Sequence, residues 1–225
     1  MKSCLIITDV QNDFCPGGAL AVPDGNQVIS VVNKISSLFD KVVATQDWHP
    51  RGHVSFASTH GRKPYETISL DGINQVLWPD HCIPGTWGAE FHEDLDTTPV
   101  DLIIRKGNNP AMDSYSAFLE NDRNTETGLL FYLIGLGLKD IYLCGLATDY
   151  CVYYSALDAF HAGFQVTVII DACRGVDIPT GNVAKAVTGM KQKNIRVETH
   201  ENFLIRSEGR CADSRSSEFN NVSPY

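Results

Sequence analysis

Residues 141–170 read IYLCGLATDYCVYYSALDAFHAGFQVTVII, and this stretch decides the fold. Residues 141–144 and 165–170 are short β-branched runs with the length of buried strands. Between them, residues 149–162 have the pattern of a helix that ends at Gly163. Strands that are apolar almost without interruption are buried on both faces of a sheet. A strand, a helix and a second strand in this order therefore predict a parallel sheet covered by helices.

The same alternation continues through the rest of the chain. Further strands are predicted at residues 4–8, 41–45, 101–104 and 195–199, and further helices at residues 28–39, 126–136 and 183–193. We therefore expect a single doubly wound α/β domain over residues 1–206, with a six-stranded parallel sheet and helices on both faces. Residues 207–225 are rich in Ser, Asn and Asp and are predicted to form a polar tail. Residues 47–100 show no clear periodic element, and a segment of that length favours a functional role.

The composition excludes several classes of protein. With 43% hydrophobic and 20% charged residues among 225, the chain is an ordinary globular protein and not a disordered one. Its apolar runs have the length of strands and fall far short of the roughly 18 residues of a membrane-spanning helix. A net charge of −9, without a cluster of lysines or arginines, argues against a nucleic-acid partner. The sequence leaves open whether copies of the chain form a homo-oligomer.

The seven cysteines indicate a reducing compartment. Their number is odd, and the N-terminus lacks the apolar core of a secretory signal. Free thiols and a cytoplasmic location are therefore expected.

Reactive side chains follow four of the predicted strands. Asp9 follows the first strand, Asp47 and His49 follow the second, Lys106 follows the third, and Cys151 lies in the helix after the fourth. In open α/β sheets, ligands bind outside the carboxyl ends of the strands. We therefore expect a carboxylate, a pair of metal ligands, an amine and a thiol to share one edge of the sheet.

Cys151 is the strongest candidate nucleophile. With Thr148 as the helix N-cap, Cys151 falls in the first turn, where the helix dipole stabilises a thiolate and free N–H groups can hold an oxyanion. The alternative is a small buried core residue, which is the expectation for Cys144. Asp9 could equally be a turn residue, and Lys106 a solvated one. Taken together, a base, a thiol and a cation suit covalent acyl transfer.

A second cluster has the composition of a metal site. Asp47, His49 and His53 lie within seven positions, and His81 follows in the same long segment. One Asp and two His suit zinc, manganese or iron, although a lone histidine is more often a satisfied core or surface group. The remaining four histidines have no such neighbours and are assigned no role.

Five motifs occur in order between residues 4 and 205. They are DVQNDF (9–14), DWHPRGHVSF (47–56), WPDHCIPG (78–85), KG with DSYSAF (106–107 and 113–118), and GLATDYCV (145–152). In these motifs the chain resembles the nicotinamidase group of the isochorismatase-like cysteine hydrolases. The resemblance implies hydrolysis of nicotinamide to nicotinate and ammonia in NAD salvage, with pyrazinamide as a further substrate.

The resemblance also implies roles for individual residues. The catalytic positions would be Asp9, Lys106 and Cys151. The metal positions would be Asp47, His49 and His81, holding zinc, with manganese or iron as alternatives. His53 matches a position that ligates the metal in some members and supports the site in others. The ring pocket would be lined by Phe14, Leu20, Trp78 and Tyr115, and a cis peptide between Leu146 and Ala147 would lie beside the oxyanion site. In the family the metal also meets the pyridine nitrogen.

Two other functions remain open from the sequence. The same scaffold handles carbamoyl compounds and, in isochorismatases, a vinyl ether; the Asp-x-His motif with a nucleophilic cysteine favours amide chemistry. Within the resemblance, residues 60–75, Tyr153 and Tyr154 are variable and leave the fine substrate preference open. A different class is a metal-dependent binding or redox-sensing protein without turnover, in which Cys144 and Cys151 could form a redox pair. A buried strand position for Cys144 argues against that pairing.

Overall fold

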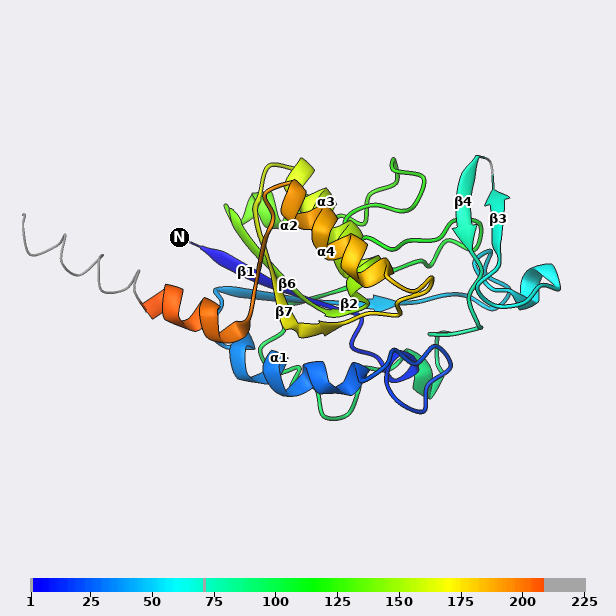
Figure 1. Ribbon diagram of the computed structural model, residues 1–225, viewed down its shortest axis with the longest axis horizontal. Coiled ribbons are helices and arrows are strands. Elements are labelled where there is room, and N and C mark those ends of the chain that lie inside the picture. Colours follow the sequence, from blue (N-terminus) through cyan, green and yellow to red (C-terminus); the bar gives the residue numbers. More distant parts are fainter. Residues whose placement is uncertain (1, 71, 209–225) are drawn as a thin grey trace, which may run out of the picture.

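The computed structural model describes residues 2–70 and 72–208 and shows a three-layer α/β arrangement (Figure 1). Six parallel strands form the central sheet in the order β5-β2-β1-β6-β7-β8. The strands are β1 (Ser3–Thr8), β2 (Lys41–Asp47), β5 (Leu102–Lys106), β6 (Asp140–Leu146), β7 (Gln165–Arg174) and β8 (Arg196–Glu198). The predicted fold class is confirmed.

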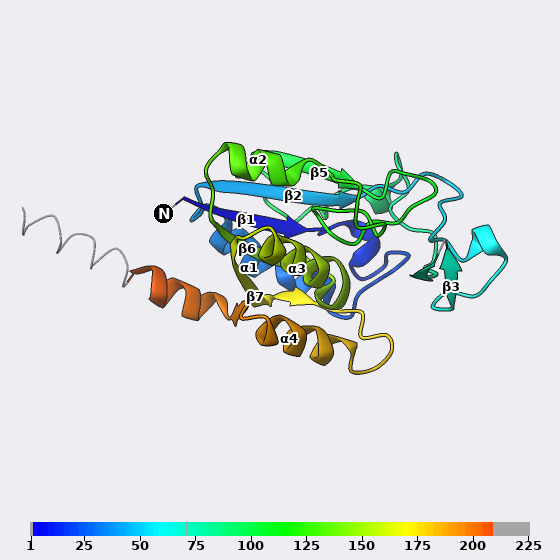
Figure 2. The ribbon, with the colours of Figure 1, turned by 90° about the horizontal axis from the view of Figure 1, so that it is seen from above.

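Helices cover both faces of the sheet, as Figures 1 and 2 show. Helix α1 (Val28–Ser36) lies on one face, and α2 (Leu129–Gly135), α3 (Tyr153–His161) and α4 (Asn182–Gln192) lie on the other. Shorter helical turns are η1 (Asn12–Phe14), η2 (Gly25–Gln27), η3 (Ser58–His60), η4 (Trp87–Ala89) and the π-helical turn η5 (Thr148–Val152). Because helices shield both faces, the central strands β1 and β6 are buried almost along their full length.

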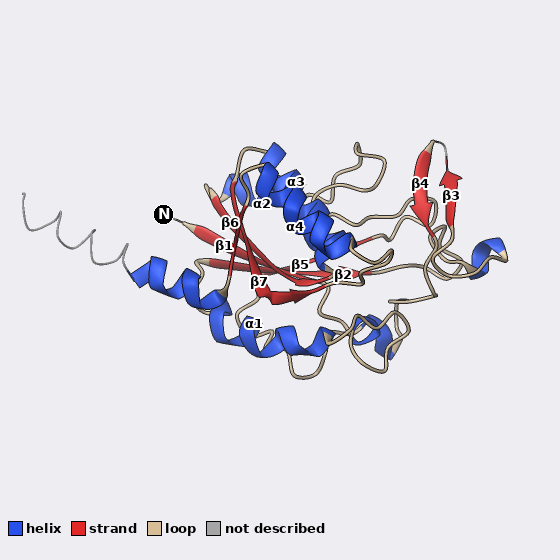
Figure 3. Cartoon of the chain, in the orientation of Figure 1, coloured by secondary structure: helices blue, strands red, loops and turns tan. Residues whose placement is uncertain are grey.

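Each predicted strand and helix of the main domain has a counterpart in the structure, with shifted ends. The helix predicted at 126–136 begins only at Leu129, because Gly128 has a left-handed φ of 92° and cannot continue a helix. The helix predicted at 28–39 ends at Ser36. Between β2 and β5 the structure adds an antiparallel hairpin, β3 (Thr67–Leu70) and β4 (Ile73–Val76), that the sequence did not predict. Figure 3 shows this hairpin apart from the main sheet, on the side of the carboxyl ends of the strands.

The start of the helix that carries Cys151 differs from the prediction. Thr148 is not an N-cap; it is the first residue of η5, and the cap is Ala147 in an extended conformation. The carbonyl of Ala147 accepts the N–H of Tyr150 and the N–H of Val152, both at 3.1 Å. Because the cap is Ala147 and not Thr148, Cys151 is the fourth residue after the cap, whereas the prediction made it the third.

The C-terminal end of the described chain is helical. Residues 200–208 form a helix on the α1 side of the sheet, where Phe203 stacks on Phe39 with ring centroids 5.2 Å apart. Of the predicted tail, 207–225, only the first two residues are described, and they continue this helix; the others lie outside the described residues. The boundary at residue 206 stays a prediction. None of the helices in residues 2–70 and 72–208 has the length and apolar character needed to cross a membrane.

Candidate active site

The acid, the lysine and the thiol meet at the carboxyl edge of the sheet. Asp9 directly follows β1, Lys106 is the last residue of β5, and Cys151 lies in η5 after β6. The Lys106 Nζ lies 2.8 Å from Asp9 Oδ2 and 3.4 Å from Cys151 Sγ. Asp9 is 0%, Lys106 1% and Cys151 6% exposed. Three residues far apart in the sequence therefore share one buried cluster.

Lys106 is surrounded by acceptors. Besides Asp9, its ammonium contacts the carboxylate of Asp47 and donates to the carbonyl of Ser114 at 3.1 Å. Burial alone would lower the pKa of Lys106, but the charges of Asp47 and Asp9 raise it well above its ordinary value. The lysine is therefore a permanent cation held between two carboxylates.

Asp9 presents one oxygen for proton transfer. The hydroxyl of Thr45 donates to Asp9 Oδ1 at 2.5 Å, whereas Oδ2 faces Lys106 as an ion pair without the alignment of a hydrogen bond. Burial raises the pKa of Asp9, and Lys106 counters part of that rise. Among the described residues, no donor is aligned on Oδ2 of Asp9. Because the pKa of this carboxylate is also raised, Asp9 is suited to accept a proton.

Burial and the neighbouring lysine act on the thiol in opposite directions. Burial raises the pKa of Cys151 well above its ordinary value, and Lys106 lowers it in part. A base beside the sulfur, which the sequence analysis expects, can therefore assist its ionisation. Sγ of Cys151 and one carboxylate oxygen each of Asp9 and Asp47 lie within 4.8 Å of one another, so Asp9 is close enough to serve.

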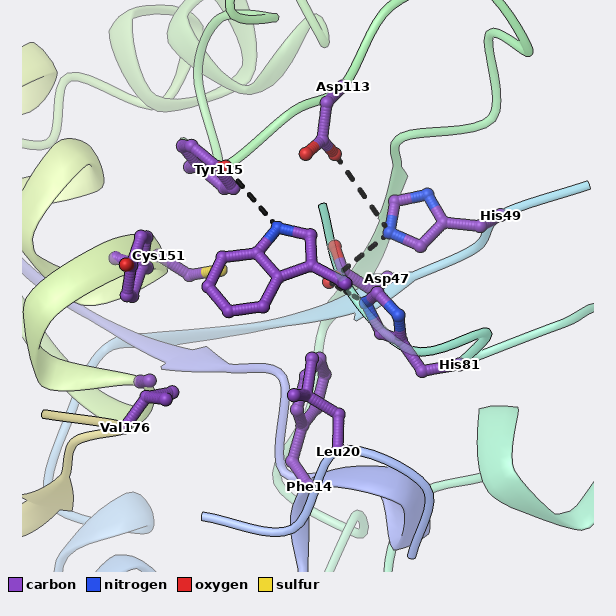
Figure 4. Close-up of a pocket in the computed structure, with 12 residues that line it drawn as sticks. Phe14, Leu20, Asp47, His49, His81, Asp113, Tyr115, Cys151 and Val176 are labelled. Carbon is purple, nitrogen blue, oxygen red and sulfur yellow. Dashed lines mark hydrogen bonds and ion pairs between the residues drawn. The ribbon is translucent and has the colours of Figure 1, made fainter. Parts of the chain in front are cut away.

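A small cavity opens in front of Cys151 (Figure 4). The four predicted ring-pocket residues all line it: Phe14, Leu20, Trp78 and Tyr115. Ala147 also lines the cavity, and the Leu146–Ala147 peptide is cis, as the resemblance implied. The side chain of Leu146 does not line it, because this residue is fully buried in the core. The cavity is mainly aromatic, with carboxylates and imidazoles on part of its wall.

Three residues of the cavity wall were assigned no role in the sequence analysis: Asp113, Tyr150 and Val176. Asp113 and Tyr150 lie inside two of the five motifs, which gave no reason to single them out. Val176 follows the long strand β7. The sequence predicts that strand only to residue 170, and a valine six positions further on carries no chemical signal.

Asp47, His49 and His81 form a compact set of potential metal ligands. One ligand atom from each lies within 4.8 Å of the others, and all three residues are buried. Nε2 of His49 is 3.5 Å, and Nε2 of His81 is 3.7 Å, from Asp47 Oδ2. The opposite nitrogens face carbonyls, Nδ1 of His49 toward Gly107 and Nδ1 of His81 toward Pro79, each at 2.8 Å. Carbonyls that accept Nδ1–H leave both Nε2 atoms free to bind a cation, so the set fits a divalent metal.

His53 lies next to this set with both ring nitrogens engaged. Its Nδ1 is 2.8 Å from the hydroxyl of Ser55, and its Nε2 is 3.2 Å from the carbonyl of Met112. The ring packs on His49 with centroids 4.3 Å apart. Burial, and then the neighbouring His49, lower the pKa of His53 to about 4. His53 therefore lies against His49, and one ligand atom each of His49, His53 and Asp113 also lies within 4.8 Å of the others.

The position of Gly107 leads to a first prediction. Gly107 has a φ of +66°, and a Cβ there would lie 2.3 Å from Cε1 and 2.6 Å from Nδ1 of the buried His49 ring. We expect Gly107→Ala to displace His49 and to lower metal affinity by about 10- to 100-fold, as loss of an outer-shell partner does. Competition with a chromophoric chelator measures this. Gly52→Ala is the matched control, because Gly52 also has a positive φ but has nothing within 4 Å of its Cβ position. Equal metal affinity in the two variants would disprove the prediction.

Comparison with known proteins places the chain among hydrolases. The model of the isochorismatase domain family matches residues 3–202. A nicotinamidase of Acinetobacter baylyi is 48% identical over 202 residues, which are 89% of this chain and 94% of that protein.

Two solved structures are similar over nearly their whole length. The nicotinamidase/pyrazinamidase of Acinetobacter baumanii has a TM-score of 0.88 and 48% identity, covering 90% of this chain and 98% of that one. The pyrazinamidase of Pyrococcus horikoshii in complex with zinc has a TM-score of 0.71 and 36% identity, covering 88% of this chain and 99% of that one.

Proposed function

The chain belongs to the isochorismatase family, and from this premise we propose that it is a metal-dependent cysteine amidohydrolase that converts nicotinamide and water to nicotinate and ammonia. The observation that carries the proposal is the meeting of Asp9, Lys106 and Cys151 beside an aromatic cavity. A relative named nicotinamidase that is 48% identical supports this choice of substrate. Nicotinate can be rebuilt into pyridine nucleotides, so the reaction serves NAD salvage. A cytoplasmic location is part of the proposal.

The first half of the reaction forms a thioester. Asp9 accepts the proton of Cys151, and the sulfur attacks the carboxamide carbon. The N–H groups of Ala147 and Cys151 hold the resulting oxyanion, and one such donor is typically worth about 2.7–4 kcal/mol. Asp9 then passes its proton to the nitrogen, the C–N bond breaks, and ammonia leaves. Lys106 keeps its charge throughout and balances the two carboxylates.

The second half returns the enzyme to its resting state. Asp9 accepts a proton from water while the water oxygen attacks the thioester carbon. The C–S bond breaks, Asp9 returns the proton to the sulfur, and the product leaves as nicotinic acid, which ionises to nicotinate. One water is consumed for each nicotinate and ammonia formed, and the enzyme is unchanged.

Asp47, His49 and His81 would hold one divalent metal, which we propose to be zinc. The zinc in the similar pyrazinamidase of P. horikoshii supports this identity, although one carboxylate with two imidazoles also suits manganese or iron. A bound ion supplies a Lewis acid beside the aromatic cavity, to which a ring nitrogen can bind. Phe14, Leu20 and Trp78 hold the ring itself. Because such a pocket discriminates poorly between near-isosteres, pyrazinamide is expected to be hydrolysed as well.

Chelation provides a test that separates the competing functions. We expect a strong chelator to lower ammonia release from nicotinamide by at least about tenfold, and added zinc to restore it. Circular dichroism before and after chelation shows whether the fold is retained. If metal-loaded protein releases ammonia from other carboxamides but not from nicotinamide, the enzyme is an amidohydrolase with a different substrate. Metal-loaded protein that turns over no amide would contradict the enzyme function altogether.

A further inference from the structure

We infer that Gln75 is a positioning residue of the substrate pocket, which it reaches from the β3–β4 hairpin. Gln75 is 2% exposed, whereas the seven other residues of strands β3 and β4 are half-buried or exposed. Its neighbour Asn74 is exposed. A buried amide is unfavourable unless its hydrogen bonds are made, so its contacts show what it does.

The side-chain nitrogen of Gln75 reaches two residues of the cavity wall. Nε2 lies 2.7 Å from Oδ2 of Asp113 and 3.2 Å from the hydroxyl of Tyr115, and it donates to the carbonyl of Val76 at 2.8 Å. The Tyr115 hydroxyl also accepts Nε1–H of Trp78 at 3.3 Å. Gln75 thus connects the hairpin to a carboxylate and to two aromatic rings of the pocket.

These contacts join two parts of the pocket wall. Figure 4 shows Asp113 facing His49 and the Tyr115 hydroxyl facing the indole of Trp78; Asp113 Oδ1 lies 4.0 Å from Nε2 of His49. On the other side of Gln75, the Tyr115 and Trp78 rings meet edge to face with centroids 6.4 Å apart. Loss of the amide would remove a donor from Asp113 and from Tyr115 together, so both side chains could leave the positions that shape the cavity.

The effect should appear in substrate binding and not in the chemical step. The hydrogen bonds of Gln75 go to Val76, Asp113 and Tyr115, and none goes to Asp9, Lys106 or Cys151. The nucleophile, its base and the lysine therefore lose no hydrogen bond of their own when Gln75 is changed. A residue that only shapes the pocket changes KM, whereas one that acts on the transition state changes kcat.

The test compares Gln75→Leu, which keeps a similar volume but has no donor, with Asn74→Leu at the exposed neighbour. The inference rests on the proposed function, because nicotinamide is taken as the ligand. Ammonia release gives kcat and KM for each protein. For Gln75→Leu we expect KM to rise about tenfold, the effect of losing a hydrogen bond to a charged group, with kcat within about twofold of wild type. Asn74→Leu should change neither value.

A double-mutant cycle tests the coupling to Tyr115. Tyr115→Phe removes the hydroxyl that Gln75 contacts. Because both variants lose the same hydrogen bond, KM of the double variant should rise by less than the product of the two single effects. Fully multiplicative effects would overturn the link between these residues.

Failure of this inference is distinct from failure of the proposed function. Wild-type protein that releases no ammonia from nicotinamide would refute the function. Active wild type together with an unchanged KM in Gln75→Leu, or with a fall in kcat alone, would overturn the role of Gln75. If Gln75→Leu is unfolded at the assay temperature, Gln75→Asn, which is one methylene shorter, carries the same expectation. Titration of nicotinate into each Gln75 variant in the Cys151→Ala background then checks binding without turnover.

Discussion

Replacement of Cys151 by alanine is expected to lower kcat/KM for nicotinamide by about 10⁴-fold or more, as loss of a nucleophile does in other hydrolases. Among the described residues, the five other cysteines are buried core residues and cannot take its place. Metal content should not change, because the sulfur is not part of the Asp47, His49 and His81 set. Ammonia release and elemental analysis of the same preparation measure both effects.

Cys144→Ala is the matched control for this variant. Cys144 lies in β6, in the core, and its Sγ is 3.8 Å from the carbonyl of Ile6. Its loss should leave turnover near that of wild type. Residual activity of Cys151→Ala within about tenfold of wild type would remove the thiol from the mechanism. Loss of activity in both variants would leave no specific role for the Cys151 thiol.

Replacement of Lys106 by methionine is expected to remove activity and to destabilise the fold. Lys106 is the cation between Asp9 and Asp47, and both carboxylates are buried, since Asp9 is 0% and Asp47 is 5% exposed. Removing one partner of a buried ion pair typically costs about 3–5 kcal/mol, because the remaining charge stays buried without compensation. A metal bound by Asp47 would compensate the charge of that carboxylate. The loss of unfolding free energy is therefore expected to come mainly from the uncompensated charge of Asp9.

Urea unfolding of the metal-loaded protein measures this loss of stability. Lys41→Met is the matched control, because Lys41 pairs with Asp101 at the partly exposed start of β2. Exposed pairs contribute little, so this variant should unfold close to wild type. A loss of unfolding free energy in Lys106→Met no larger than in Lys41→Met would contradict the account of the buried charges.

The parts of the fold that the sequence predicts best are those with a strong apolar pattern. The middle parts of β1, β6 and β7 are buried and consist largely of apolar residues, so the runs are easily recognised. Once the strands are placed, parallel topology brings the residues after them to one edge. This is why Asp9 and Lys106 could be expected beside the Cys151 turn before the structure was known.

The parts that the sequence predicts poorly depend on local packing. β3 and β4 have four residues each, which is too short to show a clear period of polar and apolar residues. Gln75 lies in no recognised motif, so the sequence did not indicate its role. The first turn of the Cys151 helix is determined by hydrogen bonds to the Ala147 carbonyl. No capping residue in the sequence predicts these hydrogen bonds. The raised pKa of Cys151 follows from burial, which the helix-dipole argument did not include.

The central claim is that the carboxamide carbon passes through a thioester on Cys151. The most direct test measures how the intermediate partitions between water and added hydroxylamine. Two substrates with different leaving groups are compared, nicotinamide and methyl nicotinate. If both form the same nicotinoyl thioester, the ratio of nicotinohydroxamate to nicotinate must be identical for the two at a given hydroxylamine concentration. A ratio that depends on the leaving group would show that the acceptor attacks the substrate directly, and would contradict covalent catalysis by Cys151.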